Sequence, residues 1–235
     1  MACYRNGVPI HRGFSRRLAA FGIGLAALAG STLSGCNREA SNGAPVRAPA
    51  VSAPDSFDVT FATTRGDVVV RAHRAWAPNG VDRLYTLVRL GYYDDTRFFR
   101  VLDGFMAQFG ASGDPAVARR WSDSTIADDP VTRSNVRGAV SFASAGPNTR
   151  TTQLFINTAA NDRLDPMGFA PVGEVVRGME AVDSLYADYG EGAPMGPGPD
   201  QSLIARDGNA YLDRQFPRLD AVRTARITAE WPGGS

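Results

Sequence analysis

Residues 98–110 read FFRVLDGFMAQFG and residues 141–157 read SFASAGPNTRTTQLFIN, and these two stretches decide the fold of the chain. Each contains short apolar runs of strand length, bounded by glycine, asparagine or aspartate, which are turn residues. Polar side chains, among them Arg100, Gln108 and Gln153, stand between large apolar ones, where a plain core would not need them. The two stretches therefore predict short strands that carry a functional site.

The rest of the chain predicts a mainly β fold with few helices. Residues 57–61 and 68–70 are apolar or alternate with period two, and the turn residues between them indicate a hairpin. Apolar residues at helical spacing follow Pro78 and stop before Gly91, which predicts a helix, and a second helix is expected near residues 182–186. Further strands are expected at residues 98–102, 105–109, 136–143, 153–157, 170–176 and 221–228. Because strands and helices do not alternate regularly, we expect a closed or nearly closed antiparallel barrel and not a doubly wound sheet.

Composition excludes several classes of protein. The 235 residues are 43% hydrophobic and 21% charged, with a formal net charge of +1. These values are typical of a soluble globular chain and not of a disordered tail, a polytopic membrane protein or a strongly basic nucleic-acid binder. All 25 basic residues are arginine, so a Schiff-base lysine and a lysine-bearing P-loop are excluded. Residues 190–199, GEGAPMGPGP, are therefore expected to form a surface loop and not a phosphate-binding loop.

Residues 1–35 have the layout of a secretory signal peptide. They contain four arginines and no acid, and residues 18–30, LAAFGIGLAALAG, form an apolar core that is too short to span a bilayer. The following Leu33-Ser34-Gly35-Cys36 resembles the bacterial lipoprotein cleavage box, after which Cys36 would become the lipid-modified first residue. The alternative is an ordinary cleaved signal followed by a coincidental cysteine.

Cleavage before Cys36 would change what the mature chain can do. The mature chain would then contain one histidine, His73, and one cysteine, Cys36. This excludes disulfides, Cys/His zinc sites and Cys–His nucleophiles, and no metal or cofactor is expected. Removing four of the 25 arginines leaves 21 against 24 acidic residues, a net charge of about −3. Residues 36–55, rich in Ala, Pro and Ser without an aromatic residue, predict a lipid-anchored flexible linker, and residues 56–235 the folded domain. The expected location is the bacterial cell envelope, on the outer membrane or periplasmic face if the cell is Gram-negative.

The two opening stretches resemble the cyclophilin-type peptidyl-prolyl isomerases. The family signature reads Phe, His, Arg, two apolar residues, Pro, Gly, Phe, Met, any residue and Gln, and residues 98–108 follow it except at Phe99 and Asp103, which replace the histidine and the proline. Residues 145–149 and 153–156 match a second stretch of the family. The resemblance implies a mainly β, closed antiparallel eight-stranded barrel with two capping α-helices, which isomerises X-Pro bonds.

The chemistry of that reaction gives Arg100 a role. Amide resonance raises a barrier of about 18–20 kcal/mol to rotation, so a catalyst must bind the twisted bond more tightly than either planar form. In the twisted form the prolyl nitrogen regains its lone pair, and a guanidinium, which stays charged, can donate a hydrogen bond to it. Arg100 is expected to be that donor.

The resemblance also implies the other site residues. Together with Arg100, the expected catalytic residues are Phe105 and Gln108. The expected ring pocket consists of Phe105, Met106, Phe155 and Leu164. The residues expected to anchor the peptide backbone are Gln108, Ala143, Ser144 and Gln153. Phe169 occupies the place of a pocket histidine in the family and is also expected to contact substrate.

Simpler interpretations remain open for each of these residues. Arg100 could merely pair with Asp103 or another acid, and the apolar candidates are residue types that fill any core. The whole chain could be a non-catalytic proline-peptide binding module or chaperone, or a purely structural lipoprotein. The expected partners are proline-containing polypeptides and, through the lipid anchor on Cys36, a membrane, with no nucleic acid, and the chain is expected to be a monomer.

Overall fold

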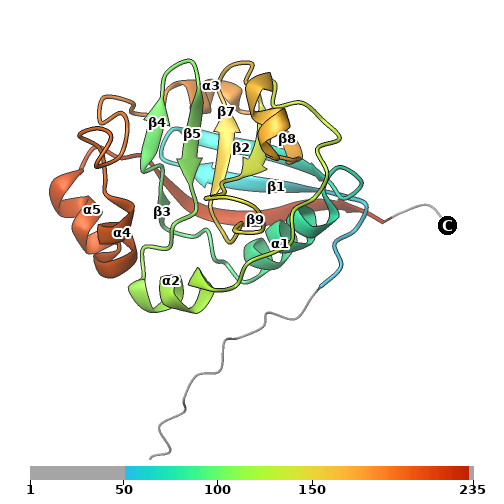
Figure 1. The fold of residues 1–235 in the computed structure, drawn as a ribbon, viewed down its shortest axis with the longest axis horizontal. Helices are drawn as coiled ribbons and strands as arrows, with labels where there is room; N and C mark the ends of the chain where they lie inside the picture. The colour runs from blue at the N-terminus through green and yellow to red at the C-terminus, as the bar shows by residue number, and fades with distance from the viewer. Residues whose placement is uncertain (1–50, 233–235) are drawn as a thin grey trace, which may run out of the picture. The chain divides into compact units, whose positions relative to one another are not determined.

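The computed structural model describes residues 51–232, which form one nine-stranded sheet with helices around it (Figure 1). The strand order is β3-β9-β1-β2-β8-β6-β7-β5-β4, and each neighbouring pair is antiparallel. The strands are β1 (Ser56–Thr63), β2 (Gly66–His73), β3 (Thr96–Arg97), β4 (Arg100–Leu102), β5 (Met106–Phe109), β6 (Ala139–Phe142), β7 (Leu154–Asn157), β8 (Pro171–Arg177) and β9 (Ala221–Trp231).

The expected hairpin and first helix are confirmed. β1 and β2 pair along their whole length, from Ser56 opposite His73 to Thr63 opposite Gly66. Their alternate apolar residues are buried and form one wall of the main core. Helix α1 (Pro78–Arg89) lies over that core and buries the apolar residues whose helical spacing predicted this helix.

The sheet curls but stays open, so the expectation of a closed eight-stranded barrel is corrected. β3 and β4 are the two ends of the strand order, and within residues 51–232 no ladder joins them. They are successive pieces of one stretch, in which the chain changes partner at Phe98 and Phe99. The N–H of Phe98 donates to the carbonyl of Asp220 (2.9 Å), beside β9, whereas Arg100 already lies opposite Gln108 of β5. The bend between these two pairings divides what would have been one barrel strand.

Five α-helices occur in the described residues, where two were expected. Besides α1 they are α2 (Pro115–Ser122), α3 (Met179–Asp183), α4 (Gln201–Asp207) and α5 (Asn209–Gln215), and a 3₁₀ helix, η1, covers Asp162–Met167. The expected second helix is α3, which begins after Gly178. Helix α2 buries none of its residues, and α4 and α5 bury only one and two, so none of them has the apolar stripe by which a helix is predicted.

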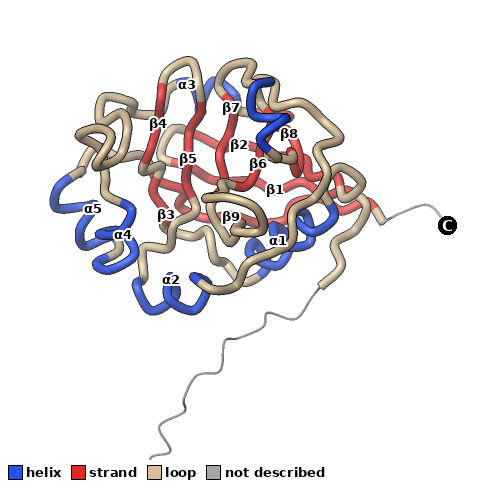
Figure 2. The backbone as a smooth tube through the Cα atoms, in the orientation of Figure 1, coloured by secondary structure: helices blue, strands red, loops and turns tan. Residues whose placement is uncertain are grey.

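Helices α4 and α5 form a small second core. Figure 1 shows them together at the side of the sheet where β3 and β4 lie, and Figure 2 shows the long loop that leads into α4. Their buried residues Ile204, Tyr211 and Leu212 pack with Phe216 and with Phe99, which comes from the bend between β3 and β4. The segment between α3 and β9, residues 184–220, therefore contacts the strand that carries Arg100.

Contacts at the start of the described chain begin before β1. The side chain of Ala53 is buried, its N–H donates to the carboxylate of Asp82 (2.9 Å), and the N–H of Arg74 donates to the carbonyl of Asp55 (2.8 Å). Residues 51–55, assigned to the linker by composition, thus contact the domain. The predicted signal peptide, Cys36 and the linker up to residue 50 lie outside the described residues. Within residues 51–232, no helix has the length and apolar character needed to cross a membrane.

Candidate active site

The β4–β5 hairpin places Arg100 directly opposite Gln108. The connection contains Gly104, whose positive φ of 66° favours glycine. Arg100 Nη1 donates to Gln108 Oε1 at 3.1 Å. The separation of eight positions between Arg100 and Gln108 in the signature therefore corresponds to a tight hairpin, which brings these two polar side chains to one face of the sheet.

A row of hydrogen-bonded side chains continues from this pair. Because β5 pairs with β7, the side chain of Gln153, just before β7, comes within reach of Gln108, whose Nε2 donates to Gln153 Oε1 at 2.8 Å. Gln153 Nε2 in turn donates to Gln201 Oε1 at 3.3 Å, at the start of α4. The two stretches that carry the resemblance are thus joined by polar side chains across one edge of a cavity.

The apolar candidates form a separate cluster beside this row. Met106, Phe155 and Leu164 are buried together, and the ring of Phe169 meets that of Phe155 edge-on at 5.7 Å. The cavity they enclose has a volume of about 210 Å³. Its lining residues are Arg100, Phe105, Met106, Gln108, Ala143, Ser144, Phe155, Leu164, Phe169 and Gln201. Pockets for drug-sized ligands are roughly 300–1,000 Å³, so this cavity fits a single side chain or ring.

The structure brings together the residues selected from the sequence. All of them in the folded domain line this cavity except Gln153, which lies beside it and is bonded to Gln108. The backbone N–H of Ala143 donates to the carbonyl of Gln153 (2.9 Å), so it is not free for a peptide. The hydroxyl of Ser144 bonds to the carbonyl and the N–H of Gly146 within its own loop, so an anchor at Ser144 has to use its backbone.

Arg100 makes an ion pair that the sequence reasoning did not find. Its Nε and Nη2 donate to Glu191 Oε1 and Oε2, both at 2.6 Å. Arg100 therefore pairs with an acid, as the simpler interpretation allowed, but the acid is Glu191 and not Asp103, and the guanidinium still lines the cavity. These hydrogen bonds from Arg100 lower the pKa of Glu191. Residues 190–199 are accordingly part of the site and not only a surface loop.

The two departures from the family signature have visible structural consequences. Phe99 is 2% exposed and packs into the α4–α5 core, so its side chain does not line the cavity. Asp103 is exposed in the turn between β4 and β5. The guanidinium of Arg163 lies 4.6 Å from the centre of the Phe105 ring, a contact that was not predicted from the sequence.

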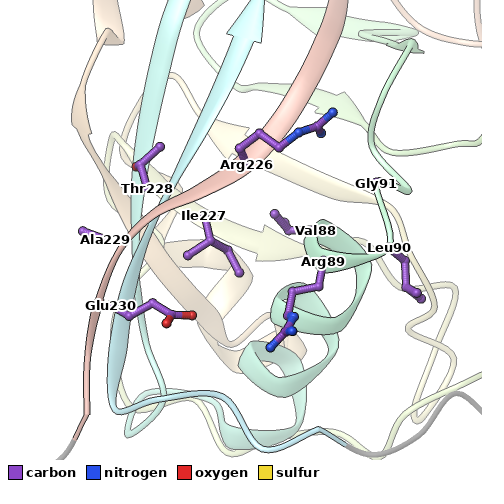
Figure 3. Close-up of a pocket in the computed structure, with 9 residues that line it drawn as sticks. All are labelled: Val88, Arg89, Leu90, Gly91, Arg226, Ile227, Thr228, Ala229 and Glu230. Atoms are coloured by element: carbon purple, nitrogen blue, oxygen red, sulfur yellow. The ribbon is translucent and has the colours of Figure 1, made fainter.

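A larger groove lies elsewhere, between the end of α1 and β9, with a volume of about 770 Å³ (Figure 3). Its charged groups are used within the protein, since Arg226 pairs with Asp94 and Glu230 accepts from the hydroxyl of Tyr85. It contains none of the predicted site residues. In residues 51–232 no three His, Cys, Asp or Glu side chains are grouped so that they could hold a metal ion. The smaller cavity, with its converging polar row, is therefore the candidate active site.

Comparison with known sequences gives the same relationship. A family model described as cyclophilin type peptidyl-prolyl cis-trans isomerase/CLD matches residues 58–197. Peptidyl-prolyl cis-trans isomerase B of Escherichia coli K12 is 33% identical over 136 residues, which are 54% of this chain and 82% of that protein. Peptidyl-prolyl cis-trans isomerase-like 3 of Mus musculus is 34% identical over 135 residues, 55% of this chain and 81% of that protein.

Solved structures show the same fold. A crystal structure of a cyclophilin-type peptidyl-prolyl cis-trans isomerase from Cryptosporidium parvum has a TM-score of 0.55 at 20% identity, and the match covers 75% of this chain and 99% of that one. A structure of the same protein in the presence of the dipeptide Ala-Pro has a TM-score of 0.54 at 21% identity, covering 73% and 98%. At this identity the likeness supports the fold, and the matching sequences support the family. The chain therefore belongs to the cyclophilin-type peptidyl-prolyl cis-trans isomerases.

Proposed function

We propose that the domain isomerises X-Pro bonds at the cavity bordered by Arg100, with the proline ring held by the apolar cluster. A single observation carries this assignment: the guanidinium and the apolar notch belong to one small cavity, with Met106 beside Arg100 Nη1. In this arrangement the ring of a bound proline lies against Phe155 and Leu164. Arg100 donates to the prolyl nitrogen as the amide loses its planarity.

The size of the expected catalytic effect follows from the interaction. A hydrogen bond from a charged donor is worth about 1.5–3 kcal/mol, which corresponds to roughly a tenfold to hundredfold change in rate. The remaining acceleration comes from holding the ring and the preceding carbonyl while the chain beyond proline rotates. Gln108 and Gln153, tied to Arg100 and to each other, are placed to hold the peptide backbone.

An isomerisation assay on a short X-Pro peptide tests this proposal, with residues 51–235 as the starting protein because Val51 and Ala53 already contact the domain. We expect Arg100→Ala to lower kcat/KM roughly tenfold to a hundredfold. Arg206→Ala is the matched control, since Arg206 also forms a two-pronged pair with an acid, Asp207, but does not line the cavity. Equal rates for the parent protein and Arg100→Ala would contradict the proposed hydrogen bond from Arg100 to the prolyl nitrogen. Peptide binding without acceleration by the parent protein would favour the binding-module alternative.

We further propose that the chain is an exported lipoprotein, anchored through Cys36, which acts on proline bonds of envelope proteins. The proposal is supported by the arginine-bearing start, the short apolar core at residues 18–30 and the cysteine that closes the cleavage box. Mass spectrometry of the membrane fraction tests it. We expect a mature chain that begins at an acylated Cys36 and the loss of acylation in Cys36→Ser, whereas a mature chain without acyl groups would contradict the anchor.

A further inference from the structure

The glycine-rich segment, residues 190–199, closes tightly around Glu191. The N–H of Gly198 donates to the carbonyl of Glu191 (2.8 Å), and the N–H of Gly192 donates to Glu191 Oε1 (2.9 Å). A Cβ at Gly196 would lie 2.4 Å from the carbonyl oxygen of Glu191, and one at Gly198 would lie 2.8 Å from it. Glycine is required at these positions because the backbone passes so close to Glu191. The segment therefore holds one carboxylate in a defined place.

That carboxylate uses only one side of the Arg100 guanidinium. Glu191 occupies Nε and Nη2, and Nη1 is left to donate to Gln108 Oε1 at 3.1 Å and to approach Met106 Sδ at 3.8 Å. A thioether sulfur is a weak acceptor, so the N–H directed at Met106 can change partner at little cost. Because Met106 lines the cavity and Glu191 does not, Nη1 is the nitrogen that faces a bound proline.

Partial burial and full use of the carboxylate oxygens favour a stable ion pair between Arg100 and Glu191. The side chains of Arg100 and Glu191 are 23% and 35% exposed, and both oxygens of the carboxylate are engaged. Arg100 lowers the pKa of Glu191, so the carboxylate stays ionised near neutral pH. A two-pronged pair between a planar guanidinium and a planar carboxylate fixes the orientation of the guanidinium plane, which a single contact does not.

We propose that Glu191 is a positioning residue for Arg100, which fixes the guanidinium so that an Nη1 N–H points into the cavity. This inference rests on the proposed donor role of Arg100. Glu191 acts through that arginine and does not touch the substrate. Its removal frees the guanidinium to rotate away from the prolyl nitrogen, so it lowers the rate of isomerisation more than the affinity for peptide.

The first test compares Glu191→Gln with Asp207→Asn, a variant in which another carboxylate of a two-pronged arginine pair is made neutral outside the cavity. Peptide exchange is followed by NMR without a coupled protease, so that kcat and KM are separated. We expect Glu191→Gln to lower kcat about tenfold, with KM unchanged within about twofold, and Asp207→Asn to match the parent protein.

The pH profile adds a readout that a purely structural role would not move. The pKa of Glu191 is depressed below its usual value of 4.5, so the pair is complete above that value and is lost as the pH falls through the depressed pKa. We expect kcat of the parent protein to fall in that acid range while circular dichroism still shows a folded chain. The Glu191→Gln variant should lack this fall.

A second variant moves the carboxylate without removing it. Gly196→Ala places a Cβ against the carbonyl of Glu191 and should displace the segment, so we expect the same selective loss of kcat. An unchanged or increased kcat in Glu191→Gln would overturn the inference while leaving the isomerase proposal intact. If Arg100→Ala were as active as the parent protein, the proposed donor role of Arg100 would be wrong, and the positioning role of Glu191, which depends on it, would be wrong as well.

Discussion

Replacing Phe99 with histidine tests what the clearest departure from the family signature does. Histidine is the usual residue at this place in the resembling family, so the substitution restores the signature. In the structure, however, Phe99 is 2% exposed and packs with Ile204, Tyr211, Leu212 and Phe216. We therefore expect Phe99→His to destabilise the α4–α5 core and to leave the chemistry at Arg100 unchanged.

The magnitude follows from two losses. Burial of a phenylalanine side chain stabilises a fold by about 1.5–3 kcal/mol. A buried imidazole without a partner costs about 1–3 kcal/mol. The two losses together give a decrease of about 2.5–6 kcal/mol in the free energy of unfolding. For a domain of this size that corresponds to a decrease in Tm of roughly 5–24 °C.

Thermal unfolding, followed by circular dichroism, measures the loss of stability, and the isomerisation assay is run well below the lower Tm. Leu90→His is the matched control, because Leu90 is 62% exposed at the end of α1 and its replacement should change stability by less than about 0.5 kcal/mol. Isomerase activity of Phe99→His should stay within about twofold of the parent protein. A tenfold gain in activity, or a Tm equal to that of the parent protein, would refute the reasoning.

Two further predictions concern Gln201 at the start of α4 and Asp94, which pairs with Arg226 of β9. Gln201→Ala removes a cavity-lining side chain that accepts from Gln153, and we expect KM for an X-Pro peptide to rise about twofold to tenfold while Tm stays within a few degrees. Asp94→Asn removes a pair with Arg226 that also accepts from the N–H of Ala225 (2.9 Å), and we expect the free energy of unfolding to fall by about 1 kcal/mol in urea titrations at pH 7. Since the hydrogen bonds from Arg226 lower the pKa of Asp94 from 3.8, this contribution is present above that pH and lost as the pH falls through the depressed pKa. The difference between the parent protein and Asp94→Asn should accordingly vanish in strong acid.

The parts of the fold that were predicted from sequence are those with a strong local period. Residues 57–61 alternate and residues 68–70 are continuously apolar because β1 and β2 bury apolar side chains in the core, and α1 has a continuous apolar stripe. Helices α2, α4 and α5 were missed because each is short and buries at most two residues. Their existence depends on tertiary contacts: α2 packs on α4, and α4 and α5 pack on each other and on Phe99. Whether the sheet closes depends on the change of partner at residues 98–100, which a local pattern does not encode.

The site was predictable where function imposes a fixed order of residues. The signature from Arg100 to Gln108 places both residues opposite each other in one hairpin, so their proximity follows from the spacing alone. Glu191 lies 91 positions from Arg100 and is a single acid in a segment with no period, so its contact could not be anticipated. The signal that does exist is the glycine pattern after it, since a Cβ at Gly196 or Gly198 would collide with the carbonyl of Glu191.

Phe99 and Arg100 are neighbours in the chain, and the segment between α3 and β9 contacts both of them. Phe99 packs against α4 and α5 of this segment, and Arg100 pairs with Glu191 from the loop that precedes these helices. Without these contacts Phe99 would be exposed to water, where its ring is not stabilised, and Arg100 would keep its hydrogen bond to Gln108 but lose its two-pronged partner. Glu191 lies within residues 58–197, which the family model matches, whereas α4 and α5 lie beyond them. The segment as a whole therefore supports the strand that carries Arg100 through one apolar and one charged contact.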